Sequence, residues 1–299
     1  MAISITILSS RTKEIVWGIR SYISPGFLIG FTIWRYVKEV ALSANKSGIC
    51  HICGNEGPLS YEHIPPRSMG NSRPTKSYRV ADIAEKHGAL DVKRTDGVHY
   101  HQQQRGVGFE TICRNCNSYL GRHYVKAYAR CISELGALLQ ESKDDKGCTG
   151  IHLEAHNVPV LSFIKHVISN FCSTTQPGTM FDCRDFLLDC ESRNLPDRYR
   201  LFMFLIPEGD SFISSGWMKI LLNEGGLKTA NLAFIATYPV GFYLYDTETS
   251  TAEPNPARYG CEITSMAKQP WGAEPCFCLD LPYMTINNSM PVPITQIRS

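Results

Sequence analysis

Four cysteines in two pairs are the residues of this chain best suited to chemistry. Cys50 and Cys53 form one C-x-x-C pair, and Cys113 and Cys116 form a second. Each C-x-x-C turn places two thiolates on one side of a tight loop, so two turns brought together supply four sulfur ligands for a structural, tetrahedral zinc ion. Four unrelated core cysteines are the alternative, since free cysteine is often buried. The 59 residues between the pairs exceed the spacing of a compact zinc ribbon and indicate an insertion.

A second set of residues carries oxygen and nitrogen atoms near these pairs. Glu62 and His63 place a carboxylate beside an imidazole that takes a proton near neutral pH. Asn117 directly follows the second pair, and its side-chain oxygen, with Glu62 and His123, predicts a site for a catalytic magnesium or manganese ion. Two simpler readings stay open: the Glu-His pair is structural, and Asn117 is the N-cap of a helix.

The order of these motifs resembles the HNH endonucleases, the zinc-knuckled branch of the ββα-metal nucleases. The resemblance rests on C-x-x-C, Glu-His-Ile-Pro and C-x-x-C-Asn, and it covers residues 48–131, about a quarter of the chain. It implies that a β-hairpin and a following helix clamp one divalent ion against the scissile phosphate. It further implies His63 as the general base, Glu62 as the acidic metal ligand and Asn117 as the ligand at the start of the helix. Motif order makes Asn71 the candidate for the family's middle residue.

Charge is distributed unevenly along the chain. The whole chain of 299 residues has 30 Lys and Arg against 28 Asp and Glu, so its net charge of +2 gives no global sign of a nucleic-acid partner. The segment from Cys50 to Cys131, however, holds twelve Lys and Arg against seven Asp and Glu. A local basic excess favours contact with the sugar-phosphate backbone of DNA, or of RNA as an alternative. The candidate contact residues are Arg67, Arg114, Arg122 and Lys126.

The helices and strands expected around these residues indicate an α+β fold. Apolar residues at steps of three and four predict a helix over 117–140 that packs on the zinc-bound hairpin. We expect a ββα-metal (HNH) module with structural zinc over 48–143, carrying an insertion at 68–108, and then a second α+β domain over 151–290 and a tail over 291–299. The second domain is predicted to contain helices over 159–172 and 182–191 and strands over 199–206, 217–222 and 232–245.

The first 47 residues form an N-terminal extension with no clear secretory signal. Residues 15–34 approach the length of a membrane span, but Arg20 and Pro25-Gly26 interrupt them. An aromatic-rich packing arm or a poorly ordered extension is therefore favoured over a membrane anchor. The eight cysteines outside the two pairs, among them Cys276 and Cys278, are predicted to be reduced core or incidental thiols in a cytoplasmic protein.

Two functions of different classes follow from the sequence. The first is a metal-dependent DNA endonuclease. The second is a non-catalytic, zinc-stabilised module that binds nucleic acid or protein. Residues 151–290 carry no catalytic motif, and we expect them to recognise DNA structure, a regulatory ligand or a protein partner. A nuclease module joined to a sensing domain resembles bacterial defence or mobile-element nucleases.

Overall fold

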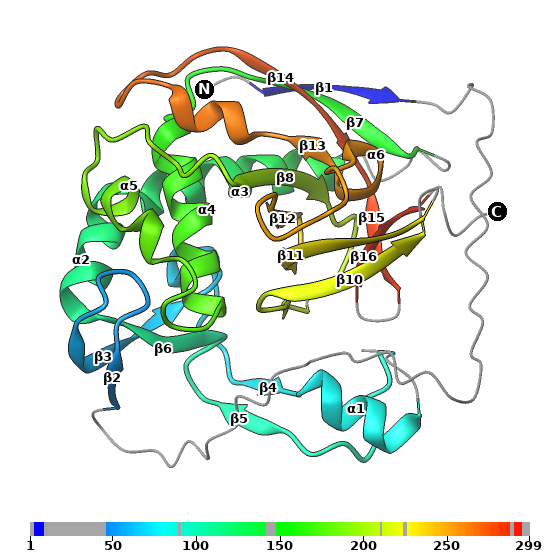
Figure 1. Cartoon of the computed structure of the whole chain (residues 1–299). Coiled ribbons are helices and arrows are strands. Elements are labelled where there is room, and N and C mark those ends of the chain that lie inside the picture. Colours follow the sequence, from blue (N-terminus) through cyan, green and yellow to red (C-terminus); the bar gives the residue numbers. More distant parts are fainter. Residues whose placement is uncertain are drawn as a thin grey trace.

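The computed structural model describes residues 3–8, 46–88, 91, 93–141, 148–209, 211–223, 226–287 and 290–294. This part of the chain has the mixed α+β composition that the sequence predicted, with helices on one side of the largest sheet (Figure 1). The predicted segment 15–34 lies outside the described residues. Among the described helices, none combines the length and the apolar character that crossing a membrane requires.

The largest sheet has six antiparallel strands in the order β10-β11-β12-β8-β13, with β9 paired to β11. It contains the strands that the sequence predicted, but the predicted strand over 232–245 is two strands. They are joined at Tyr238-Pro239, because proline favours a turn and cannot donate a ladder hydrogen bond. The strands are β8 (Tyr199–Leu205), β9 (Ile213–Ser214), β10 (Met218–Asn223), β11 (Leu227–Thr237), β12 (Val240–Asp246) and β13 (Cys261–Glu262).

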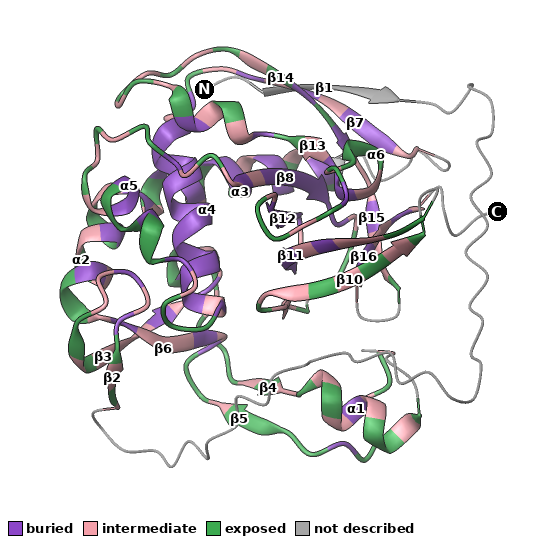
Figure 2. Ribbon diagram, viewed as in Figure 1, coloured by how far each residue is buried: buried purple, intermediate pink, exposed green. Residues whose placement is uncertain are grey.

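The helix α4 (Val160–Thr174) is buried along almost its whole length (Figure 2). Its residues from Val160 to Ser173 are all buried, and these include Lys165 and His166. The Lys165 ammonium donates hydrogen bonds to the carbonyl oxygens of Phe186 and Asp189, at the end of the short helix α5 (Arg184–Leu188). Burial lowers the pKa of His166 to about 3, so this histidine is neutral and packs in the core.

A three-stranded antiparallel sheet covers another side of the core. Its order is β1 (Ile3–Leu8), β7 (Gly150–Ala155) and β14 (Phe277–Pro282). The beginning of the predicted N-terminal extension is thus a strand, which pairs with β7 from Ile3 opposite Ala155 to Leu8 opposite Gly150. The two strands that follow, β15 (Met284–Asn287) and β16 (Met290–Pro293), form a hairpin.

The predicted tail over 291–299 is wrong for its first residues. Residues 291–293 belong to β16, and the Tyr243 hydroxyl donates a 2.6 Å hydrogen bond to the carbonyl oxygen of Pro291. This contact ties the hairpin to the outer face of the six-stranded sheet. Three further short helices are α6 (Pro256–Tyr259), which contacts β16, η2 (Phe181–Cys183), which contacts α5, and η3 (Thr264–Lys268), which contacts α4.

The segment with the cysteine motifs contains three antiparallel strands and a helix. The strand order is β2 (Ser47–Ile49), β3 (Glu56–His63) and β6 (Gly108–Cys113), and the helix α2 (Arg114–His123) follows β6 directly. The chain between β3 and β6 contains η1 (Arg67–Met69), β4 (Thr75–Ser77), α1 (Val80–His87) and β5 (His101–Gln103).

The predicted helix over 117–140 is two helices, α2 and α3 (Val125–Glu141). They break at Tyr124, which is buried and donates a 2.7 Å hydrogen bond from its hydroxyl to the carbonyl oxygen of Leu187. This tertiary contact overrides a continuous helical pattern. The helix also begins three residues before the predicted N-cap: Cys113 is the N-cap residue, and Asn117 lies inside α2.

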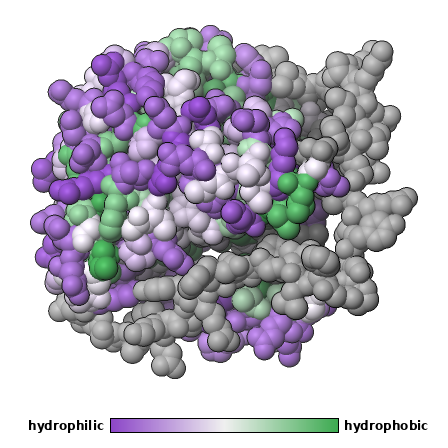
Figure 3. All heavy atoms as spheres, in the orientation of Figure 1, coloured by the Kyte–Doolittle hydropathy of each residue, from purple (hydrophilic) through white to green (hydrophobic). Residues whose placement is uncertain are grey.

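The two predicted domains share one hydrophobic core. Cys50, Ile112 and Leu120 of the cysteine-motif segment belong to the same buried cluster as Ile164 of α4 and Leu201 of β8. A second cluster, on the other face of the six-stranded sheet, includes Phe204 and Tyr243. Small hydrophobic groups are scattered among hydrophilic side chains on the surface drawn in Figure 3.

Candidate functional site

The four cysteines of the two C-x-x-C pairs lie together. Their sulfur atoms are all within 4.8 Å of one another, and the Cys53 and Cys113 sulfurs are 3.9 Å apart. A tetrahedral zinc ion with Zn–S bonds of about 2.3 Å requires sulfurs separated by about 3.8 Å. The cluster of Cys50, Cys53, Cys113 and Cys116 could therefore hold a metal such as zinc.

Strand pairing brings the two pairs together across 59 residues of sequence. Leu59 of β3 lies opposite Cys113, so the end of β6 meets the turn that precedes β3. In that turn the Gly54 amide donates to the carbonyl oxygen of Cys50 at 2.9 Å, and Gly54 has a φ of 76°, where a Cβ atom would be strained. Cys116 lies in the first turn of α2, where the exposed N–H groups favour thiolates.

The pKa values of Cys50 and Cys53 are shifted in opposite directions. A hydrogen bond from the Cys116 thiol lowers the pKa of Cys50 to about 4, and the Cys113 amide, 3.3 Å from the Cys50 sulfur, acts in the same direction. Burial raises the pKa of Cys53. A cation at the centre of such a cluster stabilises all four thiolates at once.

Glu62 is a buried carboxylate with an unpartnered oxygen. Its side chain is 5% exposed, and among the described residues its Oε2 atom has no hydrogen-bond partner. Burial raises the pKa of Glu62 to about 8, with a further contribution from the charge of Cys50. Burying a carboxylate without a partner is costly, and a bound cation would offset that cost.

Replacing Glu62 by glutamine should stabilise the protein in buffer without added magnesium or manganese. The folded-state pKa of Glu62 lies above its ordinary value of 4.5, so the wild type loses stability as the pH rises through about 8. We expect glutamine to raise the free energy of unfolding by about 1–3 kcal/mol at about pH 9 and by much less at about pH 5. Thermal unfolding at both pH values, with the cysteine-bound metal retained, measures this difference. An equal effect at the two pH values would contradict an ionised, unpartnered Glu62.

His63 is half-buried and held in one orientation. Its Nε2 atom lies 2.9 Å from the carbonyl oxygen of Arg105, and its ring packs edge-on against Tyr61 at 4.9 Å. A carbonyl oxygen only accepts hydrogen bonds, so Nε2 carries the proton and the neutral ring has Nδ1 as its proton acceptor. Burial lowers the pKa of His63, and the guanidinium groups of Arg67 and Arg105 act in the same direction.

Asn117 packs against the strand that carries Glu62 and His63. Its Nδ2 atom donates to the Ser60 hydroxyl at 3.1 Å and to the carbonyl oxygen of Tyr61 at 3.2 Å. The structure therefore brings Asn117 of α2 to the end of β3 that contains the Glu-His pair. No sequence pattern pointed to Ser60, whose hydroxyl also donates to the carbonyl oxygen of Ile112 at 2.9 Å.

Asn71 joins the two ends of the insertion. Its Nδ2 atom donates to the carbonyl oxygens of Pro65 at 2.6 Å and of Val107 at 2.7 Å, while its Oδ1 atom accepts from the Val107 amide at 2.7 Å. Gly106 packs so closely here that a Cβ atom would lie 2.6 Å from the Asn71 carbonyl oxygen. These contacts fix the chain beside Arg105, the residue that orients His63.

His123 lies apart from the other predicted ion ligands. It is six residues beyond Asn117, about 9 Å further along α2, and its ring packs on Tyr119 at 4.5 Å and near Trp271 at 6.3 Å. It belongs to neither of the two groups of metal-ligating side chains found in the described part of the chain. The structure thus sets Asn117 against the strand that carries Glu62 and His63, and places His123 in an aromatic cluster.

All four predicted nucleic-acid-binding residues are exposed, but they differ in their distance from His63. Arg67 is close enough to lower the pKa of His63, and Arg114 shares a helix face with Asn117, three residues away. Arg122 and Lys126 lie further along α2 and α3. Arg105, which packs over the Tyr61 ring at 4.6 Å, joins Arg67 beside His63.

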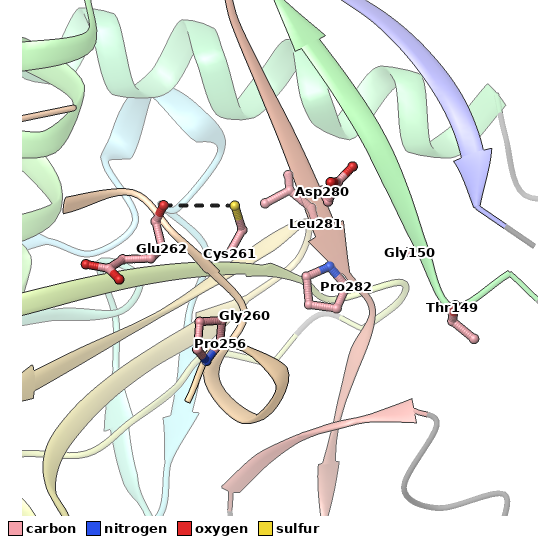
Figure 4. Close-up of a pocket in the computed structure, with 9 residues that line it drawn as sticks. All are labelled: Thr149, Gly150, Pro256, Gly260, Cys261, Glu262, Asp280, Leu281 and Pro282. Carbon is pink, nitrogen blue, oxygen red and sulfur yellow. Dashed lines mark hydrogen bonds between the residues drawn. The ribbon is translucent and has the colours of Figure 1, made fainter. Parts of the chain in front are cut away.

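A pocket of about 390 Å³ lies elsewhere, between β13 and β14 (Figure 4). Its two carboxylates already have partners. Asp280 pairs with His152 at 2.7 Å, and Glu262 pairs with Arg200 at 3.8 Å. The cysteine cluster and the neighbouring Glu62, His63 and Asn117 are therefore the stronger candidate for a functional site.

No protein-family model, curated protein or solved structure matches this chain.

Proposed function

We propose that this protein is a metal-dependent endonuclease of the HNH type that hydrolyses phosphodiester bonds in DNA. One observation carries the proposal: a buried carboxylate with an unpartnered oxygen, Glu62, adjoins a histidine whose ring is oriented for accepting a proton. Asn117 packs on the same strand and supplies a side-chain oxygen nearby. The resemblance to the HNH endonucleases assigns the roles of base, acidic ligand and helix ligand to these same three residues.

Glu62 and Asn117 would hold the catalytic ion, magnesium or manganese, since both offer oxygen atoms. Such an ion supplies charge stabilisation at the phosphoryl oxygens and at the leaving 3′-oxygen. His63 accepts a proton from the attacking water at Nδ1, while the Arg105 carbonyl holds the proton on Nε2. Asn71 fixes the backbone beside Arg105 and so acts as a positioning residue.

The substrate is held through its backbone in this proposal. Arg67 and Arg105 flank His63, and Arg114 lies on the Asn117 face of α2, so phosphates near the scissile bond would meet guanidinium groups. Arg122 and Lys126 extend the basic surface. The four cysteines would bind zinc and set the positions of β3 and α2 relative to each other.

A plasmid assay tests the proposal. The purified chain, incubated with supercoiled DNA, should produce nicked or linear DNA when magnesium or manganese is added and none without added ion. A single-stranded RNA of defined length tests the alternative substrate in parallel. If the wild type binds zinc and is folded but cleaves neither DNA nor RNA with either ion, the non-catalytic binding module is the correct function.

A further inference from the structure

The outer face of the sheet β1-β7-β14 carries a row of polar side chains that the proposed nuclease does not use. Alternation along β7 turns His152 and Glu154 away from the core, and alternation along β14 does the same for Cys278 and Asp280. The antiparallel register places Cys278 opposite Glu154 and Asp280 opposite His152. Of the two predicted alternatives for Cys276 and Cys278, core or incidental thiols, the core position does not apply, since both are exposed.

At one end of this row, Glu154 meets His156, which follows β7, and Cys276, which precedes β14. The Glu154 Oε1 atom is 3.2 Å from the His156 Nε2 atom. The Cys276 sulfur is 3.8 Å from Glu154 Oε1 and 3.9 Å from His156 Nε2. The carboxylate, imidazole and thiol thus point to a common centre, although Cys276 lies more than a hundred residues from the other two.

These separations suit a tetrahedral transition-metal ion. Ordinary zinc bond lengths to oxygen, nitrogen and sulfur require an oxygen-nitrogen separation of about 3.3 Å and separations from sulfur of about 3.5 Å. The three ligand types also belong to the set that binds zinc, whereas a thiolate is a poor ligand for magnesium or calcium. The side chains of His156 and Glu154 are 38% and 43% exposed, so water can reach the centre.

We propose that Glu154, His156 and Cys276 form a second zinc site, which is open to solvent. Three protein ligands leave a fourth position for water or for the exposed thiol of Cys278, which lies opposite Glu154. The site lies at the other end of the molecule from β2 and β3, which carry the first cysteine pair (Figure 1). It links the end of β7 to the start of β14 and is independent of nuclease activity.

Native mass spectrometry of the reduced full-length chain, supplied with zinc and then desalted, tests this site. The double variant Cys276→Ser/His156→Ala should bind one zinc fewer than the wild type, which we expect to bind two. His152→Ala is the matched control, because His152 lies on the same face of β7 but pairs with Asp280. It should retain the wild-type number of zinc ions.

Comparing the number of bound zinc ions in the wild type and the double variant distinguishes this site from the four-cysteine cluster. If the wild type bound one zinc and the double variant none, the second site would stand and the four-cysteine cluster would be the one without metal. Equal zinc numbers in the wild type and the double variant would overturn the proposal. Cys276 is exposed and both histidines are partly exposed, so circular dichroism should show both variants folded.

Discussion

Replacing His63 by alanine should lower the rate of magnesium-dependent plasmid cleavage by about 10²- to 10⁴-fold, the usual contribution of a general base. The alanine variant loses the Nδ1 acceptor that takes the proton from water. It should keep its fold, because His63 is half-buried and its described hydrogen bond is the one to the Arg105 carbonyl. Initial rates of supercoiled DNA loss, compared at equal protein concentration, measure the effect.

Two controls test whether the lower cleavage rate comes from the missing base and not from lower protein stability or from a contaminating nuclease. His152→Ala removes a histidine on the far sheet and should cleave at the wild-type rate. His63→Gly should regain part of its activity when free imidazole is added, since the small base can occupy the space of the missing ring. Cleavage by His63→Ala at the wild-type rate would refute the assignment of His63 as the base.

Replacing Cys116 by alanine should remove the metal from the four-cysteine cluster and unfold the segment from Cys50 to His123. Structural zinc contributes about 10–16 kcal/mol of apparent binding free energy in small zinc domains, which exceeds the total stability of many folds. Cys116 joins the first turn of α2 to the β2–β3 turn through this cluster. Zinc content and the thermal unfolding midpoint should fall together, and a strong chelator should have the same effect on the wild type.

Cys131→Ala is the matched control for this experiment. Cys131 is 6% exposed against 4% for Cys116, so both substitutions remove a buried sulfur, but Cys131 lies on α3 outside the cluster. The Cys131→Ala substitution should lower the free energy of unfolding by only about 1 kcal/mol, the ordinary effect of a point substitution, and leave the zinc content unchanged. Equal losses of stability in the two variants would argue that the cysteines are merely core residues.

Local sequence patterns predicted most individual elements. The helix over 159–172 corresponds to α4, and the strands over 199–206 and 217–222 correspond to β8 and β10. Errors arose where a tertiary contact decides the conformation. The helix α2 ends at Tyr124 because the Tyr124 hydroxyl donates a hydrogen bond to the carbonyl oxygen of Leu187. Residues 291–293 form a strand because they pair with β15 and because Pro291 accepts a hydrogen bond from Tyr243. Such partners lie far away in the sequence, so no local pattern reveals them.

The sequence by itself determined which residues can bind a metal and in what pairs. The C-x-x-C spacing fixes two thiols on each turn, and the adjacency of Glu62 and His63 follows from the chain. Only the tertiary structure decided which groups meet. It closed the four-cysteine cluster, set Asn117 against β3, packed His123 among aromatic rings, and brought Cys276 to Glu154 and His156. The physical reason is that metal ligands act through distances of a few ångströms, and antiparallel strand pairing sets these between residues that are remote in sequence.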